Sequence, residues 1–133
     1  MKEEQAYFAV DLGATSGRTI VGRLSGGRIT LDEITRFDNN LITVGGHVYW
    51  DIFALYNEIL RGLRIVHERG IDIRSIGIDT WGCDFVFVAK DGALLRNPIA
   101  YRDPYTFGIM EKFFKEQLSK NKVYELTGIQ FMN

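Results

Sequence analysis

The stretch that decides the fold covers residues 8–21 and reads Phe8-Ala9-Val10-Asp11-Leu12-Gly13-Ala14-Thr15-Ser16-Gly17-Arg18-Thr19-Ile20-Val21. An apolar run ends in a carboxylate, a turn of small and hydroxyl-bearing residues follows, and an arginine begins a second apolar run. Two apolar, β-branched runs separated by a Gly-rich turn are typical of a hairpin of two strands. The stretch therefore predicts a β-hairpin whose turn lies at the end of a buried strand.

The turn of this hairpin carries groups that suit the phosphates of a nucleotide. Asp11, at the strand end, is able to hold a hydrated Mg²⁺ ion. Backbone N–H groups and the hydroxyls of Thr15 and Ser16 can donate to phosphate oxygens, and the two turn glycines allow close approach. Arg18 adds a positive fork for an anion. We therefore predict a phosphate-binding hairpin.

Two better-known glycine-rich loops do not fit this turn. A Walker loop needs a lysine after its last glycine, and this turn has none. A dinucleotide fingerprint needs three glycines and an immediate helix, whereas residues 18–24 are β-branched and read as a strand. An ordinary hairpin, in which Asp and Ser side chains bond only to nearby backbone, remains an alternative.

Composition limits the class of protein. The 133 residues carry 16 basic and 17 acidic side chains, so no long-range field favours nucleic acid or a membrane surface. No apolar run approaches the roughly 20 residues of a membrane-spanning helix, and the charged amino terminus does not resemble a secretory signal. A single cysteine, Cys83, excludes an internal disulfide and favours a cytoplasmic protein. His47 and His67 are not spaced from each other or from Cys83 as zinc ligands usually are. The sequence assigns no function to His47.

Hydrophobic periodicity predicts the remaining elements. Strands are expected over residues 7–12, 18–24, 28–37, 75–79 and 84–88, with a bulge at 33–34. The first should be buried on both faces, because its apolar residues run continuously, and the strand over 75–79 should also be buried. Residues 38–46 read as a loop. Helices are expected from the Asp51 cap to about residue 69 and over 107–120, with 122–126 as a continuation.

This order of elements favours an α/β fold of the ribonuclease H-like type. Three antiparallel strands come first, and strand–helix units follow whose strand can join the same mixed sheet in parallel. Actin, the ATPase domain of the seventy-kilodalton chaperones and sugar kinases share this architecture. Topology alone does not choose among them.

A second unusual cluster reads Asp79-Thr80-Trp81-Gly82-Cys83-Asp84-Phe85. An aromatic face, bare glycine backbone and carboxylates suit a sugar, whose C–H patches stack while its hydroxyls donate to the carboxylates. The alternative is a structural turn in which Trp81 and Phe85 belong to the core. Further along, Arg102 either clamps a ligand or pairs with Asp103.

These residues resemble the FGGY family of carbohydrate kinases. The resemblance spans nearly the whole chain, and Cys83 departs from the valine expected at its place. It rests on these segments, in order: Ala9-Val10-Asp11-Leu12-Gly13-Ala14-Thr15-Ser16-Gly17-Arg18; Trp50-Asp51; Ser75-Ile76-Gly77-Ile78-Asp79-Thr80-Trp81-Gly82; Ala100-Tyr101-Arg102-Asp103; Gly128-Ile129-Gln130-Phe131. The segment around Trp81 is more specific than the phosphate turn, which all members share.

The resemblance implies ATP-dependent phosphorylation of a ketose, L-rhamnulose at its 1-hydroxyl, with fuculose or xylulose as alternatives. ATP and Mg²⁺ would be the cofactors. The residues implied to contact ATP phosphates are Ala14, Thr15, Ser16, Gly17 and Arg18. Asp11 would hold magnesium through water, and Gly82 would contact the sugar. Trp81, Asp84 and Arg102 are added as sugar contacts from their proximity in sequence or their chemistry.

Members of this family are several times longer than 133 residues. The resemblance therefore implies that residues 1–133 are the amino-terminal part of the first, sugar-binding, ribonuclease H-like domain. Its catalytic aspartate follows a histidine and would lie beyond Asn133, so no catalytic residue is expected here. The missing carboxy-terminal domain of the same chain would be the partner, and this part alone should lack kinase activity.

Two other classes stay open at this point. One is an ATP-dependent switch of the actin or chaperone type, although such a protein needs no sugar pocket around Trp81. The other is a ribonuclease H-like nuclease that uses Asp11, Asp79 and Asp84 as metal ligands. The absence of a basic surface weakens the nuclease hypothesis.

Overall fold

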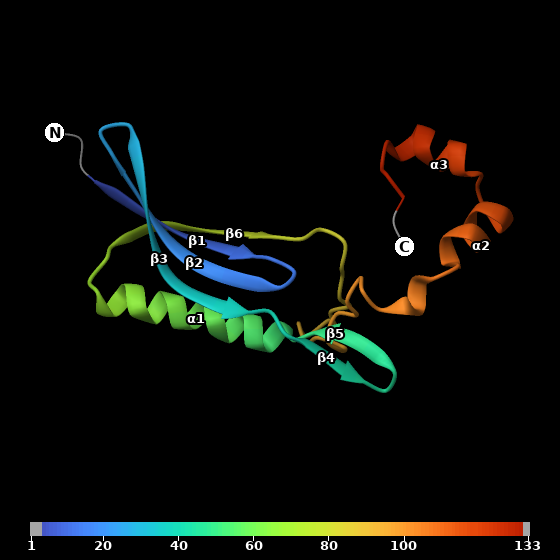
Figure 1. Cartoon of the computed structure of the whole chain (residues 1–133), viewed down its shortest axis with the longest axis horizontal. Helices are drawn as coiled ribbons and strands as arrows, with labels where there is room; N and C mark the ends of the chain where they lie inside the picture. The colour runs from blue at the N-terminus through green and yellow to red at the C-terminus, as the bar shows by residue number, and fades with distance from the viewer. Residues whose placement is uncertain (1–3, 132–133) are drawn as a thin grey trace.

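The computed structural model describes residues 4–131 (Figure 1). Its strands are β1 (Gln5–Leu12), β2 (Ser16–Ser25), β3 (Arg28–Asp38), β4 (Leu41–Val44), β5 (His47–Trp50) and β6 (Ile73–Thr80). Its helices are α1 (Ile52–Glu68), the 3₁₀ turn η1 (Pro104–Thr106), α2 (Ile109–Glu116) and α3 (Lys120–Thr127). Within residues 4–131, no helix is long and apolar enough to cross a membrane.

A four-stranded mixed sheet in the order β3-β2-β1-β6 forms the main layer. β1, β2 and β3 follow one another through tight turns and pair antiparallel, whereas β6 comes after α1 and pairs with β1 in parallel. A parallel neighbour needs a crossover of this kind, and a helix usually provides it. The predicted α/β architecture and strand order are confirmed.

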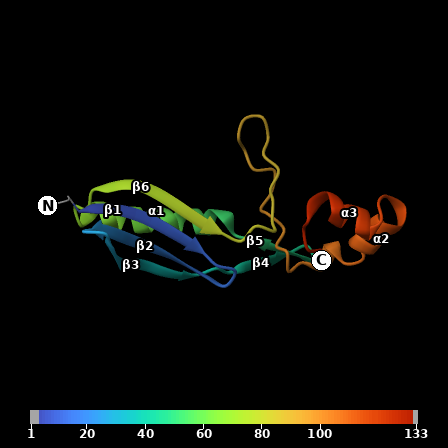
Figure 2. The same cartoon turned by 90° about the horizontal axis from the view of Figure 1, so that it is seen from above.

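The core lies between this sheet and α1, which crosses one of its faces (Figure 2). Along β1, Ala6, Phe8 and Val10 are buried and alternate with residues that are not. The expectation that β1 is buried on both faces is therefore wrong for this structure. The expectation that β6 is buried is also wrong. Ile76 and Ile78 of β6 are 53% and 58% exposed. They pair with the buried Phe8 and Val10 and so share the face on which α1 packs, but β6 is an edge strand and no described segment covers these two residues.

The expected helix boundaries of α1 are confirmed. The Asp51 side chain accepts a hydrogen bond of 3.0 Å from the Ala54 N–H, and Gly70 ends the helix with φ of 66°. Gly62 brings α1 close to the sheet, because a Cβ at this position would lie 2.5 Å from Oγ1 of Thr19. That hydroxyl in turn bonds the Thr35 hydroxyl at 2.6 Å.

The bulge expected at residues 33–34 is also present. Thr19 of β2 pairs with Thr35, whereas the next residue, Ile20, pairs with Glu33, so Ile34 has no partner across the ladder. The extra residue increases the local twist of the strand. β3 ends opposite the first residue of β2, where Asp38 pairs with Ser16, and the next residue, Asn39, contacts the turn between β1 and β2.

Three further expectations are wrong. Residues 38–46 include β4, which pairs with β5 in a hairpin closed by Gly45 and Gly46, both with positive φ. Residues 84–88 do not form a strand and make only an isolated bridge between Val88 and Leu94. The single helix expected over 107–120 is shorter, and α3 is a separate helix capped by the Ser119 hydroxyl. In each case local hydrogen bonds of turns and caps outweigh the apolar pattern.

Candidate functional site

Two predicted clusters meet at one end of the sheet. The parallel register of β1 and β6 pairs Asp11 with Asp79 at the ends of their strands. Neighbouring strands lie about 5 Å apart, and Trp81 follows β6 directly. The phosphate turn and the tryptophan segment, distant in sequence, therefore begin side by side (Figure 1).

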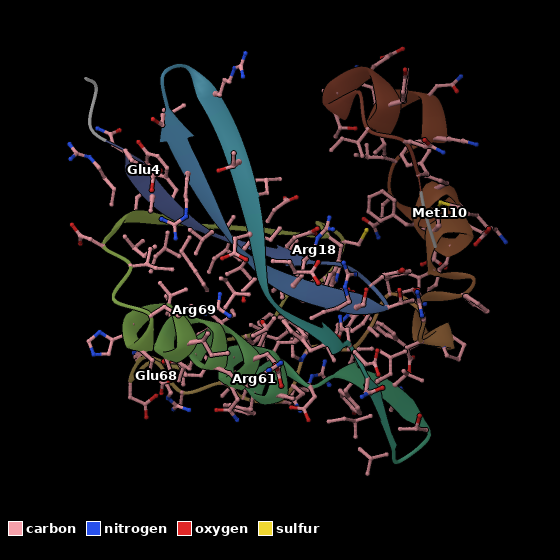
Figure 3. All side chains as sticks on the ribbon, turned by 60° about the vertical axis from the view of Figure 1, so that its left-hand side comes forward. Glu4, Arg18, Arg61, Glu68, Arg69 and Met110 are labelled. Atoms are coloured by element: carbon pink, nitrogen blue, oxygen red, sulfur yellow. The ribbon has the colours of Figure 1, made fainter. Side chains whose placement is uncertain are left out.

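Asp11 and Arg18 form an ion pair across β1 and β2. Oδ2 of Asp11 accepts a hydrogen bond of 2.9 Å from Nε of Arg18 and lies 2.8 Å from its Nη2. The two side chains are 45% and 43% exposed, so water and ligands can reach both. Figure 3 shows Arg18 on the sheet, away from the labelled charged residues of α1. Because both contacts use Oδ2, the second oxygen of Asp11 is available to a metal-bound water.

The turn between β1 and β2 is held by its own backbone. The N–H of Gly13 donates to the Ser16 carbonyl at 2.9 Å, and a Cβ on Gly13 would lie 2.8 Å from that oxygen. Ala14 and Thr15 lie at the tip, and Thr15 is exposed. Among the backbone hydrogen bonds of residues 4–131, none is donated by Ala14 or Thr15. Their N–H groups are therefore suited to an anion.

Gly17 has a packing role that the sequence did not suggest. It is buried, and the Phe37 ring occupies the space that a Cβ on Gly17 would need. The lack of a side chain at this position is thus explained by contact with β3. The assignment of Gly17 to phosphate binding stays a prediction.

Asn39, which lies in the segment expected to be a loop, also holds the turn. It follows β3, is only 7% exposed, and donates from Nδ2 to the Gly13 carbonyl at 2.9 Å. Its backbone N–H donates to the Thr15 carbonyl at 3.0 Å. The sequence offered only an Asn-Asn breaker here, because the contact depends on where β3 ends relative to β1.

Asp84 accepts hydrogen bonds from two indoles. Nε1 of Trp50 and Nε1 of Trp81 both lie 2.6 Å from its Oδ2, and the two indole rings are 4.3 Å apart between centroids. Trp50 is buried and Trp81 is half-buried. Asp84 is therefore a fixed carboxylate, and the importance of Trp50 could not be read from the sequence around Trp81.

An open groove of about 510 Å³ lies beside this cluster. Asp84 and the exposed Cys83 line it together with Tyr101 and apolar residues of α2, among them Met110 (Figure 3). Phe85, which the structural-turn alternative placed in the core, is 63% exposed and lines the same groove. Phe85 and Cys83 are therefore outside the core of the described residues, whereas Trp81 is half-buried against the buried Trp50.

Gly82, Trp81 and Arg102 do not line this groove, although Gly82 is exposed and has open space around its backbone. Arg102 does not pair with Asp103. Its guanidinium carbon lies 5.6 Å from the centre of the Tyr101 ring, and its Nε lies 3.4 Å from the Tyr101 hydroxyl. Arg102 is exposed and free to turn toward a ligand, which leaves its predicted role open.

Asp103 instead joins β5 to the turn that begins η1. Its fully buried carboxylate accepts hydrogen bonds from the N–H groups of Val48 at 2.6 Å and Tyr105 at 2.8 Å, and lies 3.3 Å from Nδ1 of His47. Burial would raise the pKa of Asp103, but these hydrogen bonds and the nearby imidazole outweigh it and lower that pKa. His47, which had no role, thus helps to anchor the loop that carries Tyr101.

The carboxylates do not form a preformed metal site. Within residues 4–131, no three His, Cys, Asp or Glu side chains are grouped closely enough to hold a metal ion. Asp84 is occupied by two indole N–H groups, which argues against the three-carboxylate nuclease centre. A single exposed carboxylate such as Asp11 fits Mg²⁺ that retains water and is shared with phosphate.

Comparison with known proteins supplies a family. Residues 6–133 match the model of the FGGY family of carbohydrate kinases, N-terminal domain. The chain is 61% identical over 130 residues to a protein named rhamnulokinase from Bacteroides thetaiotaomicron, and 45% identical over 128 residues to a rhamnulokinase from Oceanobacillus iheyensis. It covers 27% of the length of each, and these matches cover 98% and 96% of the chain.

Solved structures support the fold independently. A gluconate kinase from Lactobacillus acidophilus superposes with a TM-score of 0.73 at 17% identity, over 92% of this chain and 25% of that chain. A xylulose kinase from the same organism superposes with a TM-score of 0.72 at 17% identity, over 91% and 24%. At such low identity the likeness concerns the fold alone, which is the one predicted from strand order.

Proposed function

This chain belongs to the FGGY family of carbohydrate kinases, and we propose that it is the amino-terminal part of an ATP-dependent kinase that phosphorylates L-rhamnulose at its 1-hydroxyl. Two curated relatives at 61% and 45% identity carry the name rhamnulokinase, which supports the choice of sugar. Because the chain spans about 27% of their length, the activity is proposed for a longer protein that contains it.

The observation that carries this proposal is the register of β1 with β6. It sets Asp11 beside Asp79, so that a phosphate turn and an aromatic, carboxylate-bearing surface adjoin. A kinase needs both ligands at one place, because the γ-phosphoryl group must meet the accepting hydroxyl in line. A nucleotide-driven switch without a sugar substrate has no use for the Trp50–Trp81–Asp84 arrangement.

Each part of the site has a distinct task in this proposal. The free N–H groups of Ala14 and Thr15 and the Ser16 hydroxyl donate to phosphate oxygens, and Arg18 supplies positive charge. Asp11 holds Mg²⁺ through water, where the ion offsets phosphate charge. Trp81, Gly82, Asp84 and Arg102 contact the ketose. Asp84, fixed by two indoles, presents a carboxylate of constant direction.

The chemical step moves the γ-phosphoryl group from the terminal bridging oxygen of ATP to the 1-hydroxyl oxygen of the ketose. The proton of that hydroxyl passes to a base outside residues 1–133, in the remainder of the kinase. A second lobe is needed to close over the nucleotide and exclude water. The cytoplasm, where ATP is abundant, is the proposed compartment.

The test is a panel of ketoses given to the full-length kinase at saturating ATP and Mg²⁺. We expect kcat/KM to be at least about tenfold higher for L-rhamnulose than for fuculose or xylulose. A different preferred ketose would move the assignment within the family. ATP turnover that no sugar stimulates would contradict the proposal altogether.

A further inference from the structure

We infer that Asn39 is the positioning residue of the phosphate turn, and that it sets the nucleotide affinity of the kinase without touching the nucleotide. This inference rests on the proposed function, because the turn must bind phosphate for its orientation to matter. Nothing in the motifs of the turn itself points to Asn39, which lies on β3's carboxyl side rather than between β1 and β2.

Asn39 fixes two carbonyls of the turn at once. Its Nδ2 donates to the Gly13 carbonyl at 2.9 Å and its backbone N–H donates to the Thr15 carbonyl at 3.0 Å. Both oxygens therefore point toward the end of β3. The turn cannot rotate either peptide without breaking one of these hydrogen bonds.

The same contacts determine where the donors of the turn point. In a planar trans peptide the N–H lies opposite the C=O of the same unit. The Gly13 carbonyl shares its peptide with the Ala14 N–H, and the Thr15 carbonyl shares its peptide with the Ser16 N–H. By drawing both oxygens toward itself, Asn39 turns both N–H groups away from β3, and one of them, that of Ala14, is a proposed phosphate donor. Preorganised donors bind an anion better than donors that must first reorient.

The side chain of Asn39 is poorly explained as a stabilising feature of the fold. It is 7% exposed, and its Oδ1 is buried without a hydrogen-bond partner among residues 4–131. A buried polar atom without a partner is destabilising, and most are satisfied in folded proteins. Of the side-chain amide of Asn39, only the Nδ2 group makes a hydrogen bond, and its acceptor belongs to the turn. A local violation of this kind is expected where function requires the residue.

Two variants of the full-length kinase separate positioning from folding. Asn39→Leu keeps a similar shape, removes the donor and removes the unpartnered oxygen, while Asn39→Ala removes the whole amide. The adjacent Asn40→Ala is the matched control, because Asn40 is exposed and has no hydrogen bond to the turn. Calorimetric titration with ATP in the presence of Mg²⁺, without sugar, measures nucleotide affinity independently of turnover.

We expect both Asn39 variants to weaken ATP binding about tenfold, the value of one net hydrogen bond, and to leave the ketose KM within about twofold. Asn40→Ala should leave both constants unchanged. Asn39 variants that bind ATP like the parent would overturn the inference, as would a failure of both to fold, since Asn39 would then serve the fold. An unaltered kinase that binds no ATP overturns it too. ATP binding without ketose phosphorylation contradicts only the proposed function.

Discussion

Asp11 and Arg18 face each other across two strands, and their exposure makes the pair a test of function rather than of stability. An ion pair with about half its surface in water contributes about 0–1 kcal/mol to folding. If the pair binds Mg²⁺ and phosphate, Asp11→Asn or Arg18→Ala should lower kcat/KM of the full-length kinase by about a hundredfold or more. Steady-state kinetics and urea unfolding of the same variants measure the two effects separately.

Arg23 offers a matched control for this experiment. It lies on the same strand, β2, and pairs with Glu4 at 3.0 Å. Glu4 lies at the other end of the sheet from Arg18 (Figure 3). Arg23→Ala should change kcat/KM by less than about twofold, within the small effect of an exposed pair. Equal losses in Arg18→Ala and Arg23→Ala would assign both pairs to structure, and an active Asp11→Asn enzyme would remove the proposed magnesium ligand.

The free energy of unfolding should depend on pH through Asp103. Its pKa is lowered: burial opposes ionisation, but the Val48 and Tyr105 N–H groups and His47 favour it more strongly. Its stabilising effect is thus complete above the ordinary aspartate pKa of about 3.9 and is lost as pH falls through the lowered value. Asp103→Asn should be less stable than the parent at pH 7, and the difference should shrink below about pH 4.

Urea unfolding at pH 7, 5 and 3 checks this expectation. Asp91→Asn is the control, because Asp91 also accepts a backbone N–H, from Ala93, but lies in an exposed turn. Its effect should be small at every pH. An Asp103→Asn variant that loses the same stability at pH 3 as at pH 7 would show that the charge of Asp103 is not what stabilises the loop.

The contact between α1 and β2 depends on Gly62. Replacing glycine by alanine inside a helix gains about 1 kcal/mol from helix propensity. Here a Cβ would lie 2.8 Å from Cγ2 and 2.9 Å from Cβ of Thr19, atoms close to the backbone that cannot move aside. Overpacking of this kind costs about 1–3 kcal/mol. Gly62→Ala should therefore lower the free energy of unfolding, by up to about 2 kcal/mol in urea titrations.

Gly77 of β6 is the corresponding control. No atom lies within 4 Å of the place where its Cβ would be. Gly77→Ala should be neutral or slightly stabilising, because it restricts the unfolded chain without a steric conflict. A Gly62→Ala variant that is as stable as Gly77→Ala would mean that α1 shifts freely along the sheet.

The uncovered edge strand β6 governs how the 133-residue chain behaves by itself. Ile76 and Ile78 are more than half exposed on β6, which is also an edge strand of the sheet. An exposed, apolar edge strand favours pairing with another chain. We expect concentration-dependent association in sedimentation experiments, reduced by the double substitution Ile76→Thr and Ile78→Thr. A monomer at all concentrations would contradict this expectation.

Catalysis by the same 133-residue chain is not expected. One lobe cannot enclose both substrates, and the proposed base lies outside it. ADP release that depends on both ATP and rhamnulose should be below detection for the isolated chain and present for the full-length kinase. Turnover by the isolated chain would show that these residues contain a complete site.

The sequence determined the elements whose residues lie close together in the chain. The β1–β2 hairpin, the bulge of β3, the Asp51 cap and the strand order all follow from local spacing and periodicity. The residues of the phosphate turn and of the tryptophan segment could also be predicted, because each group is continuous in sequence. The local pattern predicted a loop over residues 38–46, where β4 pairs with β5 in a hairpin. It also predicted a strand over residues 84–88, which are apolar but pair with no strand.

Only the tertiary structure decided which distant residues meet. The indole of Trp50 reaches Asp84, His47 reaches the buried Asp103, and Asn39 reaches the turn at Gly13. None of these pairs shares a sequence spacing, because each depends on where one strand or loop ends relative to another. Periodicity records which face a side chain takes, whereas its partner across the fold is set by chain topology and close packing.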